Sequence, residues 1–233
     1  MICFIDYRTT TREKEALNSL NLNIIEIPKC HTVYEAINGH ADIQMNILDK
    51  KLKKIIINRN IDENFKKKLS DLNIKYIESE NSLKETYPSN IFLNALILED
   101  YFVHNLNYSD KNLLKYQTEK TLINVKQGYT KCSCLPVNNK ALITSDIGIY
   151  KVLSKYGFDI LLIPPGDIIL KGLNYGFIGG SGGLINDETM AFFGNLKYYK
   201  YGYEVKAFLK KHNVNPIYLS DEKLHDRGSI FII

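Results

Sequence analysis

The stretch from Lys131 to Pro164, KCSCLPVNNKALITSDIGIYKVLSKYGFDILLIP, predicts a strand, a tight turn, a second strand, a helix and a third strand. The first predicted strand, 132–137, is short and apolar. Asn138-Asn139 can turn the chain back because asparagine tolerates positive φ. The return strand is then predicted over 141–144.

The second half of this stretch has the signals of a helix followed by a buried strand. Ser145 is the predicted N-cap, since its hydroxyl can accept a hydrogen bond from a free backbone N–H. Apolar residues then recur at helical spacing, at Ile149, Val152, Leu153 and Tyr156. Gly157 can adopt the left-handed conformation that ends a helix, and 160–163 is a continuous apolar strand.

The rest of the chain repeats this ββαβ plan at a period of about 40 residues, which indicates a repeat architecture. The first copy lacks an opening strand, and the terminal segment GSIFII supplies one. We therefore predict an α/β fold, a five-fold pseudosymmetric ββαβ propeller whose ring is closed by the C-terminal strand, in a single domain spanning 1–233. The alternative, an open α/β sheet with antiparallel excursions, leaves both termini unexplained. The predicted units are 228–233 plus 1–28, 42–78, 90–126, 131–164 and 175–220.

Composition restricts the classes of protein that remain. The 233 residues carry a net charge of only +4, too mild to indicate a nucleic-acid partner. The four cysteines fit neither a disulfide framework nor a zinc motif. No apolar run approaches the roughly 20 residues of a membrane helix, and no leader sequence is evident at the first residues. A reduced, cytoplasmic protein without a membrane partner is expected.

Five such units, with the last strand completing the first, resemble the pentein fold, the α/β propeller of guanidino-group-modifying enzymes. Four segments, HADIQMN, VKQGYTKCS, YGFIGGSGG and LHDRGSI, resemble a bacterial branch of that superfamily. The resemblance implies that the first strand of each unit lines a central channel with the active site at its mouth. It thereby selects the residues that begin these strands: His40, Asp42, Gln44, Asn90, Asn94, Lys131, Cys132, Gly179, Gly180, Ser181, Asp226, Arg227 and Ser229.

Chemistry on a guanidinium group needs a carboxylate to hold the planar cation, a thiolate to attack its central carbon and a histidine to move protons. The triplet His40-Ala41-Asp42 resembles the His-x-Asp element of such enzymes. This makes His40 the predicted acid and base, and Asp42 its partner or a substrate carboxylate. The alternative is a hydrogen-bonded turn that leads into a strand.

The nucleophile departs from the superfamily pattern. The resemblance implies a cysteine near the C-terminus, after a glycine, but this chain has Gly228-Ser229 there. Ser229 is a poorer nucleophile, since a hydroxyl needs a strong adjacent base. Cys132 is the other candidate, because the charge of neighbouring Lys131 would lower its thiol pKa. The alternative is that Cys132 is a small buried strand residue.

The remaining predicted site residues are assigned to ligand binding. Asp226, Lys131 and Asn90 are predicted to bind substrate, together with Gly179, Gly180 and Ser181. The glycine run fails the spacing of phosphate-binding loops, so its missing side chains would let a ligand or another strand approach the backbone. No metal is expected, because only His40 and Asp42 stand at a spacing that suggests ligands, and no cofactor is expected.

Three functions remain open. The first is a hydrolase or transferase that acts on an arginine-like or amidine molecule, and the second is a non-catalytic protein that binds a small cation in the same pocket. The third is a ribosome- or RNA-associated factor, suggested by the alternating lysines and tyrosines of 197–201. For that stretch, an amphipathic segment leading into the last helix is the simpler interpretation.

Overall fold

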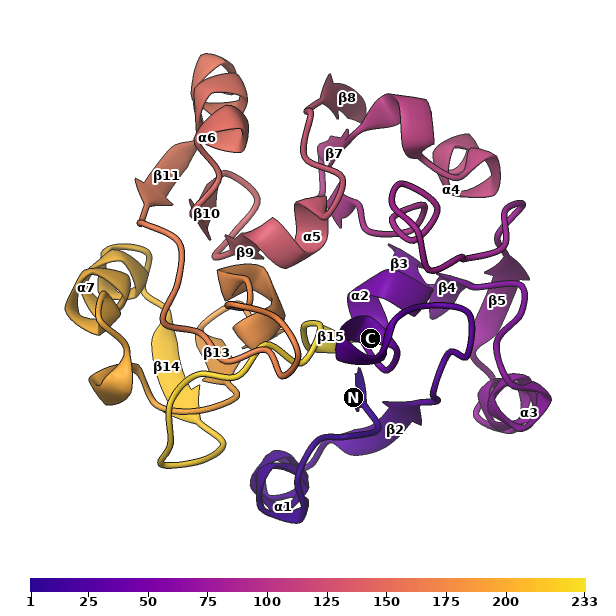
Figure 1. Ribbon diagram of the computed structural model, residues 1–233, viewed down its shortest axis with the longest axis horizontal. Coiled ribbons are helices and arrows are strands. Elements are labelled where there is room, and N and C mark those ends of the chain that lie inside the picture. The colour runs from indigo at the N-terminus through magenta and orange to yellow at the C-terminus, as the bar shows by residue number, and fades with distance from the viewer.

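A computed structural model describes residues 1–233, and its strands form five separate three-stranded sheets. Figure 1 shows the sheets arranged around a common centre, with longer helices at the periphery. In each sheet the middle strand pairs antiparallel with one neighbour and parallel with the other. In sheet order the strands are β15 (Phe231–Ile232), β1 (Ile2–Asp6) and β2 (Asn23–Ile27); β3 (Met45–Asp49), β4 (Lys54–Ile57) and β5 (Lys75–Glu78); β6 (Leu96–Ile97), β7 (Tyr101–His104) and β8 (Thr121–Asn124); β9 (Cys134–Pro136), β10 (Ala141–Thr144) and β11 (Asp159–Leu162); and β12 (Gly182–Asn186), β13 (Thr189–Phe192) and β14 (Asn215–Tyr218).

One helix joins the middle strand of each sheet to its parallel neighbour. These helices are α1 (Thr11–Asn18), α3 (Glu63–Asp71), α4 (Lys111–Lys115), α6 (Ile147–Leu153) and α7 (Gly202–Lys211). Helix α1 begins with the capping box predicted by its sequence, in which the Thr10 side chain and Glu13 satisfy each other's backbone N–H groups. The predicted cap of α6 is wrong by one residue: the Asp146 carboxylate, not Ser145, accepts from the backbone of Ile149. The last turn of that helix ends at Gly157 with φ of 73°, as predicted.

The segments predicted as long inner strands are mostly short helical turns. Helix α2 (Ala41–Gln44) and helix α5 (Thr130–Ser133) lie where the second and fourth units were predicted to begin with a strand, and the 3₁₀ turn η4 (Ile178–Ser181) precedes β12. In the third unit the strand predicted over 91–98 is reduced to β6. All four residues of α2 are buried. Alternation of polar and apolar residues therefore does not indicate a strand here, because neither face of the segment is exposed to solvent. The remaining 3₁₀ turns are η1 (Glu35–Ile37), η2 (Leu106–Tyr108), η3 (Ser154–Tyr156) and η5 (Leu196–Tyr198).

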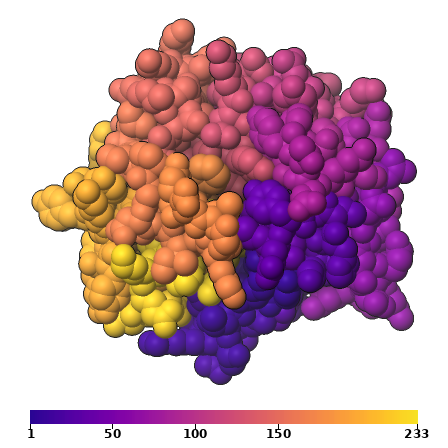
Figure 2. Space-filling view, viewed as in Figure 1, coloured from indigo at the N-terminus to yellow at the C-terminus, as the bar shows by residue number.

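The C-terminal strand lies beside the N-terminal one. Cys3 pairs with Ile232 and Phe4 with Phe231 in the antiparallel β1–β15 ladder. Figure 2 shows the surfaces of the two chain ends adjoining, yellow against indigo. Strand β15 is therefore part of the first sheet.

The apolar core is divided into clusters between neighbouring sheets. One cluster joins the first and second sheets through residues such as Phe4 and Ile57, and another joins the fifth and first through Phe193 and Ile5. A further cluster, which includes Cys132, lies where the inner turns meet. None of the helices has the length and apolar composition needed to cross a membrane.

Candidate active site

The short turns that begin the units carry polar residues that meet at the centre of the molecule. His40 and Asp42 lie at the start of α2, and Lys131 and Cys132 lie in α5. Asp226 and Ser229 come from the segment that leads into β15. Every one of these side chains is at least nine-tenths buried. The predicted site residues of three different units are thus brought together: His40, Asp42, Lys131, Cys132, Asp226 and Ser229.

The histidine, one carboxylate and the thiol form the tightest group. The ligand atoms of His40, Asp42 and Cys132 all lie within 4.8 Å of one another. Nδ1 of His40 also lies 3.8 Å from Oδ1 of Asp226. Both ring nitrogens of His40 and Oδ1 of Asp42 are buried without a hydrogen-bond partner. An unsatisfied buried polar group costs about 1–3 kcal/mol, and these three atoms are therefore available to a polar group from outside the chain.

Asn94 holds Cys132 in place; the resemblance placed it at the start of the third unit but assigned it no role. Its side-chain nitrogen donates to Sγ of Cys132 at 3.0 Å and to the carbonyl of Asp42 at 2.8 Å. Its side-chain oxygen accepts from the backbone N–H groups of Lys131 at 2.9 Å and Cys132 at 3.2 Å. One amide therefore connects the second, third and fourth units. The only signal in the sequence is its position at the start of the third unit, where the other units carry site residues.

Lys131 is linked to Asp42 through Ser229. Its Nζ donates to Oγ of Ser229 at 2.9 Å, and that hydroxyl lies 2.6 Å from Oδ2 of Asp42, to which it donates. Ser229 has φ of 72°, an uncommon conformation for a residue with a side chain. The preceding Gly228 allows close packing, because a Cβ there would meet the His40 side chain at 2.2 Å. A left-handed turn thus directs the Ser229 hydroxyl between an ammonium group and a carboxylate.

The predicted lowering of the Cys132 thiol pKa by Lys131 is wrong. Burial, and then the negative charges of Asp42 and Asp226, raise the pKa of Cys132 well above its usual value. Burial and the two carboxylates outweigh any effect of the Lys131 charge, and the Lys131 ammonium donates to Ser229. Burial likewise lowers the pKa of Lys131 and raises that of Asp226. Without a ligand, Cys132 is a protonated thiol.

The space beside the glycines of this run is occupied by other parts of the protein and is not open to a ligand. A Cβ at Gly179 would lie 2.3–2.5 Å from the backbone carbonyls of Cys134, Lys131 and Cys132, and one at Gly180 would lie 1.9 Å from the Asp226 carboxylate. The hydroxyl of Ser181 donates to the carbonyl of Ile178. These residues allow α5 and Asp226 to pack closely, so the contacts of Gly179, Gly180 and Ser181 are with the chain and not with open space.

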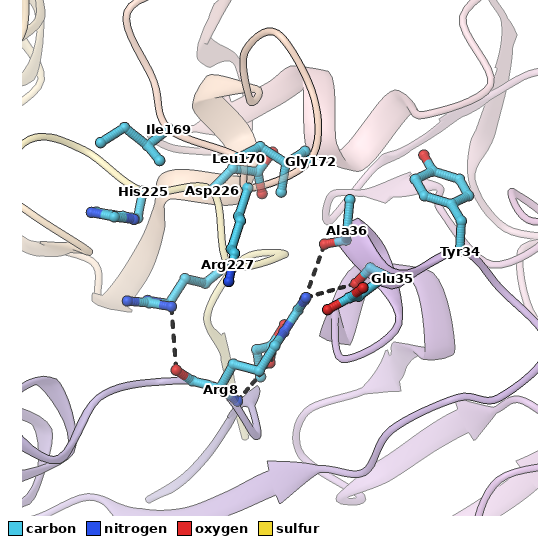
Figure 3. Close-up of a pocket in the computed structure, with 12 residues that line it drawn as sticks. Arg8, Tyr34, Glu35, Ala36, Ile169, Leu170, Gly172, His225, Asp226 and Arg227 are labelled. Atoms are coloured by element: carbon cyan, nitrogen blue, oxygen red, sulfur yellow. Dashed lines mark hydrogen bonds and ion pairs between the residues drawn. The ribbon is translucent and has the colours of Figure 1, made fainter.

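A cleft of about 700 Å³ leads from the surface to Asp226. Its lining includes Arg8, Tyr34, Glu35 and Arg227, and Figure 3 shows the Arg8 side chain extending toward the backbone of Glu35 and Ala36. Tyr34 lies 3.3 Å from Tyr129, hydroxyl to hydroxyl. Nearby Asn90 is buried, with its amide nitrogen bound to the carbonyl of Glu85 and its side-chain oxygen unpartnered. Of the arginines and tyrosines of this cleft, the resemblance selected only Arg227, by its place before the terminal strand.

Comparison with solved structures identifies the class of fold. Inosamine-phosphate amidinotransferase from Streptomyces griseus matches with a TM-score of 0.57 and 12% identity, covering 92% of this chain and 74% of that chain. SxtG, an amidinotransferase of the saxitoxin biosynthetic pathway from Microseira wollei, matches with a TM-score of 0.58 and 10% identity, covering 94% of this chain and 77% of that chain. DDAH from Pseudomonas aeruginosa, solved as a complex with citrulline, matches with a TM-score of 0.53 and 10% identity, covering 93% of this chain and 90% of that chain. These proteins are penteins, and the fold of this chain is of the pentein type.

At the level of sequence, the family is also defined. The model of the Family of unknown function (DUF6873) matches residues 4–231, and the chain belongs to that family. No curated protein matches the sequence.

Proposed function

We propose that this protein is a hydrolase or transferase that acts on the guanidino or amidino group of a small arginine-like molecule. Cys132 is the nucleophile and His40 the general acid and base. The observation that carries the proposal is the convergence of Cys132, His40 and Asp42 within 4.8 Å, with imidazole and carboxylate atoms left unpartnered. Nucleophile, proton carrier and cation-binding carboxylate are the three groups that this chemistry requires.

Two carboxylates flank the histidine and supply the binding site for a cation. Oδ1 of Asp42 is free, whereas Asp226 is held by the backbone N–H groups of Phe177 and Gly228 at 2.8 and 3.0 Å. Charge-assisted hydrogen bonds from a planar guanidinium to carboxylates are strong and directional. We therefore assign ligand binding to Asp42 and Asp226, and we assign a supporting contact to Asn90, whose side-chain oxygen is buried and unpartnered. Lys131 and Ser229 hold Asp42 in position.

The same carboxylates explain how a protonated thiol can become a nucleophile. The negative charges of Asp42 and Asp226 raise the pKa of Cys132, so a bound cation that offsets them lowers that pKa. The thiolate then forms only in the complex with ligand. Such coupling restricts the reactivity of the buried cysteine to the correct substrate.

The chemical steps follow from these positions. The Cys132 thiol gives its proton to His40, and the sulfur forms a bond to the central carbon of the guanidinium group. The carbon–nitrogen bond to the leaving amine breaks as His40 returns the proton to that nitrogen. Water then attacks the S-linked intermediate in a hydrolase, or an acceptor amine does so in a transferase, and the C–S bond breaks to restore the thiol.

The cleft is the route by which the ligand reaches the buried groups. Its volume of about 700 Å³ is within the range of small-molecule sites, and Asp226 belongs to both the cleft and the buried cluster. We also infer that residues 1–233 are a single domain whose ring of five sheets is closed through β15. The β1–β15 ladder and the apolar cluster between the fifth and first sheets support this inference.

A non-catalytic cation-binding protein is the second candidate. The observation that favours it is the raised pKa of Cys132 together with Ser229 at the place of the expected cysteine. The RNA-associated alternative has less support. Tyr199 of the Lys/Tyr stretch is buried in the core, and Lys197 is paired with Asp221 at 2.6 Å.

The test is a thermal-shift screen of arginine, agmatine and methylarginines, with ammonia and amine release measured on every hit. Turnover is expected, and Cys132→Ala should abolish it, whereas the buried control Cys134→Ala should keep it. Chloroacetamidine, a cationic electrophile, should label Cys132 faster than the neutral iodoacetamide does. Binding without turnover or labelling selects the second candidate, and absence of binding, turnover and labelling refutes both.

A further inference from the structure

The three groups at the centre of the site also form a set of metal donors. His40, Asp42 and Cys132 offer one nitrogen, one oxygen and one sulfur within 4.8 Å of each other, and all three residues are buried. A three-residue set of this composition with an open fourth position is typical of zinc sites. The sequence predicted no metal here, because Cys132 is 90 residues from Asp42 and only the fold adds it to the pair.

A second observation shows that these donors lack partners within the protein. His40 is 1% exposed, and neither of its ring nitrogens has a hydrogen-bond partner. Oδ1 of Asp42 is buried and unpartnered as well. The nearest cationic side chain, Lys131, is engaged by Ser229 and the Gly179 carbonyl. The donors are thus left available to a group that comes from solution.

We propose that His40, Asp42 and Cys132 bind a divalent ion of the zinc class, and that this ion and a cationic organic ligand exclude each other. The second half of the proposal rests on the proposed function, because it assigns the same atoms to the guanidinium chemistry. Tetrahedral zinc with ordinary bond lengths places its donors roughly 3.3–3.8 Å apart. The set therefore needs to contract by only about 1 Å, within the reach of side-chain rotation.

The surroundings support an ion that carries two positive charges. Asp42 and Asp226 make the cluster negative, and a metal ion offsets that charge at the position of the thiol. On binding, the Cys132 thiol loses its proton to solvent as the sulfur–metal bond forms, so one proton is released per ion. Oδ1 of Asp226 lies 3.8 Å from Nδ1 of His40, so a movement of about 1 Å on metal binding would let that nitrogen donate to it, as metal-binding histidines donate to the carboxylates that orient them.

The donor set also selects among metals. A thiolate and an imidazole favour zinc, cobalt and copper over magnesium or calcium, which prefer oxygen donors. The open fourth position would hold water. An ion at this position occupies both the nucleophile and the proton carrier.

The metal-binding half is tested by adding Co²⁺ to the full chain after treatment with a chelator, without any substrate. We expect a cobalt–thiolate charge-transfer band that saturates at one ion per chain and disappears when Zn²⁺ is added. Cys132→Ser should remove the band. Asp226→Asn should weaken binding about 10- to 100-fold, because it removes the carboxylate that orients His40. The exposed histidine provides a matched control, and His31→Gln should leave the titration unchanged.

The outcomes separate this proposal from the proposed function. Absence of a cobalt–thiolate band in the wild-type protein overturns the metal site, and so does a band that persists in Cys132→Ser. If the protein turns over substrate in the presence of chelator and shows no cobalt–thiolate band, the proposed function stands and the metal site is refuted. If the band forms but no substrate is turned over, the metal site stands and the proposed function is refuted. Saturating Zn²⁺ should slow labelling of Cys132 by chloroacetamidine more than 10-fold, and unchanged labelling refutes mutual exclusion.

Discussion

The buried charge of Lys131 can be tested by the substitution Lys131→Met, which keeps a long apolar side chain and removes the ammonium. In the wild-type protein, Nζ of Lys131 is 2.9 Å from Oγ of Ser229, which is 2.6 Å from Oδ2 of Asp42. Asp42 is fully buried. Lys131 and Asp42 form no direct ion pair, but removing the ammonium leaves the buried carboxylate uncompensated, a change that costs about 3–5 kcal/mol when a buried ion pair is broken. We expect the free energy of unfolding of Lys131→Met to fall by that amount in a urea titration with unchanged m-value.

A second substitution separates charge from packing. Adding Asp42→Asn to Lys131→Met removes the uncompensated carboxylate, so the double variant should regain all but about 1–2 kcal/mol, the cost of incomplete hydrogen bonding of a buried amide. Methylguanidinium should stabilise Lys131→Met more than the wild type, because it can replace the lost cation. The exposed pair of Lys223 and Asp167 is the control, and Lys223→Met should change stability by less than about 1 kcal/mol. Equal stability of Lys131→Met and wild type, or strictly additive losses in the double variant, would refute the reasoning.

Three further predictions concern buried residues, two of them beside the candidate site. Gly179→Ala should lower the free energy of unfolding by more than about 2 kcal/mol in urea titrations, because its Cβ would overlap three backbone carbonyls; a neutral effect would contradict the packing described. Asn94→Leu should cost about 1–3 kcal/mol, since it leaves the buried N–H of Cys132 unpaired while the N–H of Lys131 keeps the Asn94 backbone carbonyl, and it should slow labelling of Cys132; normal labelling in a folded variant would exclude the positioning role. Burial lowers the pKa of His104 to about 4, below its unfolded value of 6.5, so its contribution of about 3 kcal/mol is complete above pH 6.5 and is lost as pH falls toward 4; His104→Gln should flatten that dependence in urea titrations.

The repeat could be predicted from the sequence because its signals are local. Apolar runs separated by residues such as Asn138 and Gly157 mark strands and helix ends, and each unit repeats them. The inner turns could not be predicted in the same way. Residues of α2 and α5 are buried on every side at the centre, so the alternation that distinguishes a strand from a helix on a half-exposed surface carries no information there.

The electrostatics of the site were not predictable for a different reason. Lys131 precedes Cys132 in the chain, and adjacency suggested that its charge acts on the thiol. Consecutive residues of a helical turn point in different directions, and the Lys131 ammonium lies instead with Ser229, 98 residues away. The pKa of Cys132 is raised first by its burial and then by the charges of carboxylates from other units.

The pseudosymmetry of the fold accounts for the place of the cysteine. The turns that begin the second and fourth units, Asn94 of the third and the segment before β15 all deliver side chains to one central point. These positions are equivalent in the repeated unit, since each lies just before the strand that pairs antiparallel with the middle strand of its sheet. A reactive group can therefore come from any unit without a change of backbone, provided that its neighbours supply the complementary charges. In this chain the fourth unit supplies the thiol, and the C-terminal position supplies the Ser229 hydroxyl that joins Lys131 to Asp42.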